Sequence, residues 1–395
     1  MLVIRNIGEL FLGDGRSIRN AQLRVEDGRI LDFGANGDEV LDARGGAVIP
    51  GLIDSHTHLL FAGTRADEFV MRAKGMSYLE IASAGGGIWR TVEAVRKASL
   101  EELVELALPR LQRMLSYGIT TVEVKSGYGL TVGDEIKMLL AVRKLQELQP
   151  VELVSTYLGA HTVPPEFRDR RGAYVDLVVS DELMGRIADE GLAEFVDVFC
   201  EESAFTVEES RRILLAGITR GLAGRIHADQ ITQMGASRLA AEVRCVSADH
   251  LERIDEGGIA ALRSAGVIAG LLPGCSFYLG VPQAPARRLL DSGVRVAFAT
   301  NYNPGSSMVE SLPLVLSIAC TQMRVTPSEA LVGATSTAAA ALRREGSLGR
   351  IEKGMVADLV VLGAPSVDQW LSEVGRGSVR TVLKRGRVVH ESPRS

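Results

Sequence analysis

The chain has 395 residues, of which 46% are hydrophobic and 24% charged, which is the balance of a folded globular enzyme. Its net charge of −5 argues against a nucleic acid or an anionic membrane surface as the main partner. The four cysteines are scattered without C-x-x-C spacing, so we expect reduced thiols in a cytoplasmic protein. No run of about 18 apolar residues predicts a membrane span.

Both ends of the chain are predicted to be β-rich. Residues 1–48 carry short strand candidates separated by turn signals, without helical periodicity and without the apolar region of a signal peptide. Residues 346–395 carry a strand candidate at 357–362 and a hairpin at 380–391 that is broken at Gly386. Because neither end is long enough to bury a core alone, we predict that 1–48 and 346–395 form one small composite β-sandwich domain.

The middle of the chain, residues 49–345, alternates apolar strand candidates with helical stretches. Capping-box patterns open helices at Ser99, Thr206 and Thr326. The strand candidates are 46–50, 119–124, 151–157, 195–199, 223–226, 245–248, 267–272 and 294–299. This alternation predicts an α/β fold, a (β/α)8 TIM barrel. An open doubly wound sheet is the alternative, but no G-x-G-x-x-G follows the first strand to favour it.

Histidines gather at one end of this predicted barrel. Five of the six histidines directly follow strand candidates: His56, His58, His161, His227 and His250. The C-terminal ends of barrel strands meet on one face, where barrel enzymes hold their active sites. Two imidazoles spaced two residues apart on an extended chain point the same way and can share one metal ion. The sequence therefore predicts a metal site.

The last strand candidate is followed by Asn301. A barrel metal site of this kind usually includes a carboxylate, which offsets the charge of the ion and can accept a proton from bound water. An amide oxygen can ligate weakly, but it carries no charge and is no base.

Several motifs resemble the imidazolonepropionase family of the amidohydrolase superfamily, over nearly the whole chain. The segments that carry the resemblance are Gly51-Leu52-Ile53-Asp54-Ser55-His56-Thr57-His58, Phe61-Ala62-Gly63-Thr64-Arg65, Glu123-Val124-Lys125-Ser126-Gly127-Tyr128-Gly129-Leu130, Leu158-Gly159-Ala160-His161, Ile226-His227-Ala228-Asp229-Gln230, Ser247-Ala248-Asp249-His250-Leu251, Asn303-Pro304-Gly305-Ser306-Ser307 and Gly354-Met355-Val356-Ala357-Asp358-Leu359-Val360.

The resemblance implies a reaction and a metal. The reaction is hydrolysis of the cyclic amide-like C–N bond of 4-imidazolone-5-propanoate to N-formimidoyl-L-glutamate, a step of histidine degradation. The implied cofactor is one divalent ion, zinc or iron, on His56, His58, His227 and the residue at 301. Members of the family that this chain resembles share an Asp at that last position, so we expect Asn301 to impair turnover. Lys125 is interpreted as a supporting residue near a single ion, not as the bridging ligand of two.

The resemblance also implies roles for the remaining site residues. We expect His250, Gln230 and Asn301 to be catalytic. The expected substrate-binding residues are Arg65, Tyr78, Tyr128, His161, Gln230, Asn303, Gly305 and Ser306. Arg65 suits the small-molecule carboxylate substrate, because a guanidinium binds a carboxylate through two hydrogen bonds.

Two other functions stay open at this point. One is a deaminase or cyclic amidohydrolase of the same superfamily acting on another small substrate. The other is a binding protein that kept the pocket but lost catalysis through Asn301. A homodimer is the expected option for a protein partner; no nucleic acid or membrane partner is expected.

Overall fold

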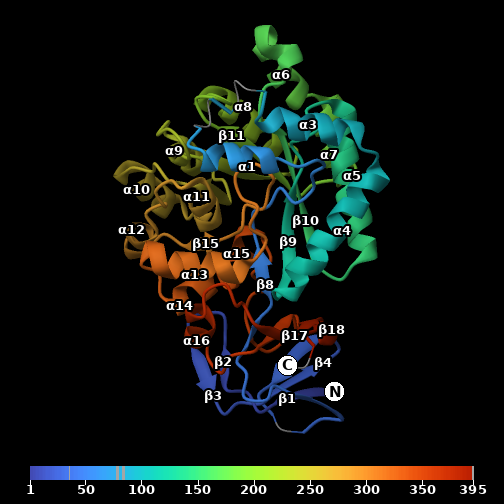
Figure 1. The fold of residues 1–395 in the computed structure, drawn as a ribbon, viewed down its shortest axis with the longest axis vertical. Helices are drawn as coiled ribbons and strands as arrows, with labels where there is room; N and C mark the ends of the chain where they lie inside the picture. Colours follow the sequence, from blue (N-terminus) through green and yellow to red (C-terminus); the bar gives the residue numbers. More distant parts are fainter. Residues whose placement is uncertain (35, 77–79, 82–84, 394–395) are drawn as a thin grey trace.

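The computed structural model describes residues 1–34, 36–76, 80–81 and 85–393. A parallel eight-stranded sheet surrounded by helices occupies one end, and two smaller sheets with both chain termini occupy the other (Figure 1). The order of pairing in the large sheet is β15-β14-β13-β12-β11-β10-β9-β8, and every pair is parallel. This is the predicted (β/α)8 barrel.

The barrel strands run from the first third of the chain to residue 298. They are β8 Leu52–Asp54, β9 Ile119–Lys125, β10 Glu152–Ala160, β11 Phe195–Cys200, β12 Ala223–Ala228, β13 Ser247–His250, β14 Ile268–Leu271 and β15 Val296–Phe298. The helices around them are α1 Ala66–Ala73, α3 Ile88–Lys97, α4 Leu100–Ser116, α5 Val132–Leu148, α6 Arg171–Val178, α7 Arg186–Asp189, α8 Val207–Thr219, α9 Ala236–Glu242, α10 Glu256–Ala265, α11 Pro273–Leu279, α12 Ala286–Asp291, α13 Leu312–Met323, α14 Pro327–Gly333 and α15 Ser336–Ala341.

The three predicted capping boxes are present. The side chains of Ser99, Thr206 and Thr326 each accept a hydrogen bond from the backbone N–H of the third helix residue. That residue is a glutamate in each case, and its carboxylate accepts a hydrogen bond from the backbone N–H of the capping residue. Each such cap stabilises its helix by about 1 kcal/mol. Local sequence therefore fixes the starts of α4, α8 and α14.

The ends of the barrel sheet, β8 and β15, meet through a buried carboxylate. Asp54 accepts hydrogen bonds from the backbone N–H of Thr300 at 3.0 Å and from its hydroxyl at 2.6 Å. Beyond the strand ends, the N–H of Asn301 donates to the carbonyl of His56 at 3.0 Å. Burial raises the pKa of Asp54 to about 7. These bonds bring the segment after the last strand onto the segment after the first.

The small sheets contain strands from both chain ends. One has the order β5 Arg29–Asp32, β4 Leu23–Glu26, β1 Leu2–Arg5 and β6 Glu39–Asp42; the other has the order β18 Arg387–Glu391, β17 Val379–Lys384, β16 Leu359–Leu362, β7 Val48–Pro50, β2 Glu9–Phe11 and β3 Ser17–Arg19. Ile4, Leu23 and Leu383 belong to a hydrophobic cluster that is distinct from the main barrel core. The small α16, Val367–Ser372, lies beside these sheets (Figure 1).

One strand assignment was wrong. The run 46–50 was predicted as the first barrel strand, but β7 pairs antiparallel with β16 in the small domain, and the barrel begins with β8. The chain crosses between the two sheets at Gly51, where an added Cβ would lie 2.2 Å from Oγ1 of Thr120. Pro50 is the last residue of β7 that pairs with β16, and only glycine fits at the crossing that follows. The exact domain boundaries stay a prediction.

Within the described part of the chain, no helix combines the length and the apolar character that crossing a membrane requires.

Candidate metal and substrate site

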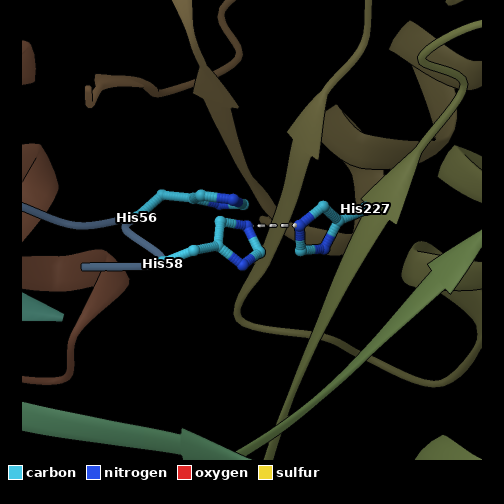
Figure 2. Close-up of side chains that lie close together, drawn as sticks. All are labelled: His56, His58 and His227. Atoms are coloured by element: carbon cyan, nitrogen blue, oxygen red, sulfur yellow. Dashed lines mark hydrogen bonds between the residues drawn. The ribbon is translucent and has the colours of Figure 1, made fainter. Parts of the chain in front are cut away.

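Three buried histidines meet inside the barrel. His56 and His58 follow β8, and His227 lies in β12. One ring nitrogen from each lies within 4.8 Å of the others, and a ring nitrogen of His58 points toward one of His227 (Figure 2). His227 and His250 were predicted just after their strands, but both lie within them, since the ladder pairs His227 with Asp249 and Ala228 with His250.

A buried carboxylate fixes the protonation of His56. Its Nδ1 lies 2.8 Å from Oδ2 of Asp249, which also accepts from Arg225 at 2.9 Å. An ionised carboxylate only accepts hydrogen bonds, so Nδ1 carries the proton and Nε2 has a free lone pair. Among the described residues, this buried Nε2 has no hydrogen-bond partner. His56 is therefore held as a ready metal ligand.

His227 has the same arrangement on the other side of the barrel. Its Nδ1 lies 3.2 Å from Oδ1 of Asp197, which also pairs with Lys125 at 2.8 Å. Lys125 pairs in turn with Glu123 at 2.7 Å, which places it beside the site as a supporting residue. The Nε2 of His227 lies 3.4 Å from Nε2 of His58. Two ring nitrogens at this distance need a shared proton or a shared cation between them.

The surroundings keep these imidazoles neutral. Burial lowers the pKa of His56 and His58 well below the ordinary value, with further lowering by Lys125 and His161 respectively. Burial also lowers the pKa of His227, although Asp197 opposes that shift. The neutral form is the one that binds metals.

Asn301 follows the last barrel strand, and its backbone N–H donates to the carbonyl of His56 at 3.0 Å. Its φ is +53°, a left-handed conformation that asparagine tolerates better than most residues. The side chain is buried, and its Oδ1 has no hydrogen-bond partner among the described residues. The same is true of Nδ1 of His58. Unpartnered buried polar atoms are costly in a folded protein, and the three converging histidines fit a bound divalent cation.

Two aromatic side chains flank the histidines. The His161 ring stacks on His58 with centroids 5.0 Å apart, and Tyr128 lies 5.3 Å from His161 and 5.9 Å from His58. The loop that holds Tyr128 is anchored by buried Glu135, whose carboxylate accepts from the backbone N–H groups of Gly127, Gly129 and Leu130. Burial lowers the pKa of His161 to about 3, so this ring is also neutral.

Arg65 lies against the loop after the last strand. A Cβ added to Gly305 would lie 2.1 Å from Nη1 of Arg65, so the guanidinium packs on this glycine. Asn303 forms the turn itself: its Oδ1 accepts from the N–H of Gly305 at 2.9 Å and of Ser306 at 2.8 Å. Its Nδ2 donates to the carbonyl of Asn301 at 2.6 Å, which ties this loop to the histidine site.

Of the other expected site residues, His250 lies beside the three histidines, Gln230 lies just after β12, and Tyr78 is not among the described residues. The His250 ring lies 5.4 Å from that of His227, and its Nδ1 is 3.4 Å from Oε1 of Glu252. Gln230 is half-buried and follows the end of β12. Tyr78 lies outside the described residues, so its expected role stays a prediction.

Sequence reasoning missed the carboxylates that orient the histidines. Asp197 lies in the strand sequence Phe-Val-Asp-Val-Phe, and Asp249 precedes His250. A charged residue inside an otherwise apolar strand was the available signal, because a buried charge needs a partner. Glu68, which pairs with Arg65 at 2.8 Å, was also missed.

Comparison with known proteins gives consistent matches. The model of the amidohydrolase family matches residues 65–390. The imidazolonepropionase of Geobacillus kaustophilus is 47% identical over 384 residues, covering 94% of this chain and 90% of the relative. That of Myxococcus xanthus is 47% identical over 408 residues, covering 98% and 96%.

Solved structures share the fold at lower identity. The 5-methylcytosine deaminase from Klebsiella pneumoniae, liganded with 5-fluorocytosine, has a TM-score of 0.79 at 17% identity and covers 100% of this chain and 98% of that one. The atrazine chlorohydrolase from Arthrobacter aurescens TC1, complexed with zinc, has a TM-score of 0.74 at 20% identity, with coverage of 99% and 95%. The barrel, its buried histidines and the near full-length likeness to curated relatives place this chain in the imidazolonepropionase family of the amidohydrolase superfamily.

Proposed function

We propose that this chain hydrolyses the cyclic C–N bond of 4-imidazolone-5-propanoate to N-formimidoyl-L-glutamate in histidine degradation. The observation that carries the proposal is the 47% identity to imidazolonepropionases over almost the whole length. The three converging histidines support it, since they suit a metal-dependent hydrolase.

One zinc or iron ion is the proposed cofactor, held by His56, His58, His227 and the oxygen of Asn301. When bound, such an ion lowers the pKa of water and polarises a carbonyl. Asp249 and Asp197 hold two of the imidazoles as Nδ1–H tautomers, so that both Nε2 atoms are available as ligands.

His250 is the proposed proton acceptor. Its Nδ1 faces Glu252 at 3.4 Å, which leaves Nε2 to take a proton from the attacking water and return it to the leaving nitrogen. Gln230 is proposed to read the ring, because its amide offers both a donor and an acceptor. Asn301 cannot take a proton, so we expect turnover below that of a chain with a carboxylate at this position.

Arg65 is the proposed ligand of the propanoate carboxylate. Tyr128 and His161, which lie beside the histidines, are proposed to contact the ring, together with Tyr78. Asn303, Gly305 and Ser306 are proposed to shape and bind the tail end of the substrate through the turn next to Arg65.

The test is turnover of 4-imidazolone-5-propanoate by the purified chain and by Arg65→Ala. We expect measurable hydrolysis by the native chain and a strongly raised KM in the variant. A native chain that binds the substrate without any turnover, even after Asn301→Asp, would favour a binding protein instead. A homodimer in the cytoplasm is part of the proposal; sedimentation at micromolar concentration checks the dimer.

A further inference from the structure

We propose that Glu68 is a positioning residue for substrate recognition, because it fixes the orientation in which Arg65 presents its guanidinium to the substrate carboxylate. This inference rests on the proposed role of Arg65.

Glu68 lies in the first turn of α1 and is fully buried. Its Oε2 accepts a hydrogen bond from Nη2 of Arg65 at 2.8 Å, and its Oε1 accepts one from the backbone N–H of Gly87 at 2.9 Å. Both partners are donors. Only a carboxylate satisfies both, since a glutamine would turn its own N–H groups toward one of them. Glu68 thus links the arginine to the segment that leads into α3.

The guanidinium of Arg65 is confined on its other side by Gly305, where an added Cβ would lie 2.1 Å from Nη1. The arginine is only 8% exposed. Its buried Nε has no hydrogen-bond partner among the described residues, so the group keeps unused donor capacity. Glu68 therefore occupies part of the guanidinium and leaves the rest for a second carboxylate.

The buried Arg65–Glu68 ion pair is better explained by the orientation it gives to Arg65 than by a gain in the stability of the fold. Burying two charges costs several kcal/mol, which their attraction often does not exceed. Burial would raise the pKa of Glu68, but the hydrogen bonds from Arg65 and Gly87 lower it below the ordinary value, so the side chain is ionised. A guanidinium already held in place loses little freedom on binding a ligand. Bidentate recognition depends on such orientation.

The main test compares Glu68→Gln with the native chain. We expect KM for imidazolone-propanoate to rise roughly 10- to 100-fold, the effect of losing a hydrogen bond to a charged group, with kcat changed less than about twofold. Glu93→Gln is the matched control: it makes the same substitution at an exposed glutamate of α3 and should leave both constants unchanged.

A positioning role differs from a structural one in two readouts. For the carboxamide analogue of the substrate, Glu68→Gln and the native chain should have the same KM, because the analogue lacks the carboxylate. In an Arg65→Ala background, Glu68→Gln should add no further loss. Equal losses for substrate and analogue, or additive losses in the double variant, would overturn the inference.

The outcomes separate this inference from the proposed function. If Arg65→Ala leaves KM unchanged, the proposed role of Arg65 is wrong. If Arg65→Ala raises KM but Glu68→Gln does not, only the role of Glu68 is wrong. If Glu68→Gln does not fold, Glu68→Asp tests the same contact, because it keeps the charge but shortens the reach to Arg65 and Gly87: a KM raised for the substrate and not for the carboxamide analogue supports the inference, and an unchanged KM for both contradicts it.

Discussion

Replacing Asn301 by Asp should raise turnover strongly. The two side chains have nearly the same shape, and the backbone here is held by the bond from the N–H of Asn301 to the carbonyl of His56 at 3.0 Å. The carboxylate would therefore take the place of the amide. It would add one negative charge and one proton acceptor beside the three histidines.

The expected gain in turnover follows from which groups near the histidines are already paired. The neighbouring carboxylates are already engaged: Asp249 with His56 and Arg225, and Asp197 with His227 and Lys125. Neither is free to accept a proton from water. A positioned general base contributes about 10²–10⁴ in rate, which corresponds to roughly 3–5 kcal/mol of barrier. Because His250 is already the proposed proton acceptor, we expect a gain near the lower end of this range, about 10²-fold.

The assay is kcat/KM for imidazolone-propanoate, measured for both chains at equal zinc occupancy. The zinc dissociation constant, measured by competition with a chelator, should also fall in the variant, because a charged ligand replaces a neutral one. If turnover and zinc affinity are the same in both chains, Asn301 does not lie at the reacting centre and our reading of the site is wrong.

Three further predictions concern the groups around the histidines. Asp197→Asn should weaken zinc binding by about 10- to 100-fold, measured by chelator competition; unchanged affinity would mean that the carboxylate does not orient its histidine. Burial lowers the pKa of the site histidines, to about 3 for His161 against an ordinary 6.5, so below pH 6.5 the unfolded chain binds more protons than the folded one. Each such histidine should therefore remove up to about 1.4 kcal/mol of stability per pH unit as the pH falls, while Asp54, with its pKa raised to about 7, acts in the opposite direction. Urea unfolding of chelator-treated protein between pH 7.5 and 5, a range of about two and a half units, should thus give falling stability, and a flat profile would contradict the burial of neutral histidines. Glu135→Gln should lower the free energy of unfolding by about 1–3 kcal/mol, because its carboxylate accepts three backbone N–H groups of the Tyr128 loop; wild-type stability would show that the loop does not depend on this carboxylate.

Much of the architecture was predictable because local signals and the global fold agree here. The alternation of apolar runs and capped helices predicted the barrel, and capping residues such as Ser99 marked helix starts directly. The break at Gly386 separated the last two strands. The H-x-H pair followed from the period of an extended chain, and the structure brings both histidines to His227.

Other features depended on contacts that a single sequence does not reveal. The run 46–50 is apolar enough for either sheet. The structure pairs it with β16 of the small domain, and the barrel begins only after Gly51, which lies against Thr120 of β9. The partners of the site, such as Asp249 on His56 at 2.8 Å, are 193 residues apart in the chain. Periodicity assigns a residue to a face but does not say which distant side chain it meets there.

The central claim is that His56, His58 and His227 bind one divalent ion together. Zinc titration of the chelator-treated chain, with His58→Ala beside it, tests this most directly. We expect one tightly bound ion per chain and a loss of tight binding in the variant. A chain that takes up no zinc at saturation, or a variant that binds it as tightly as the native protein, would contradict it.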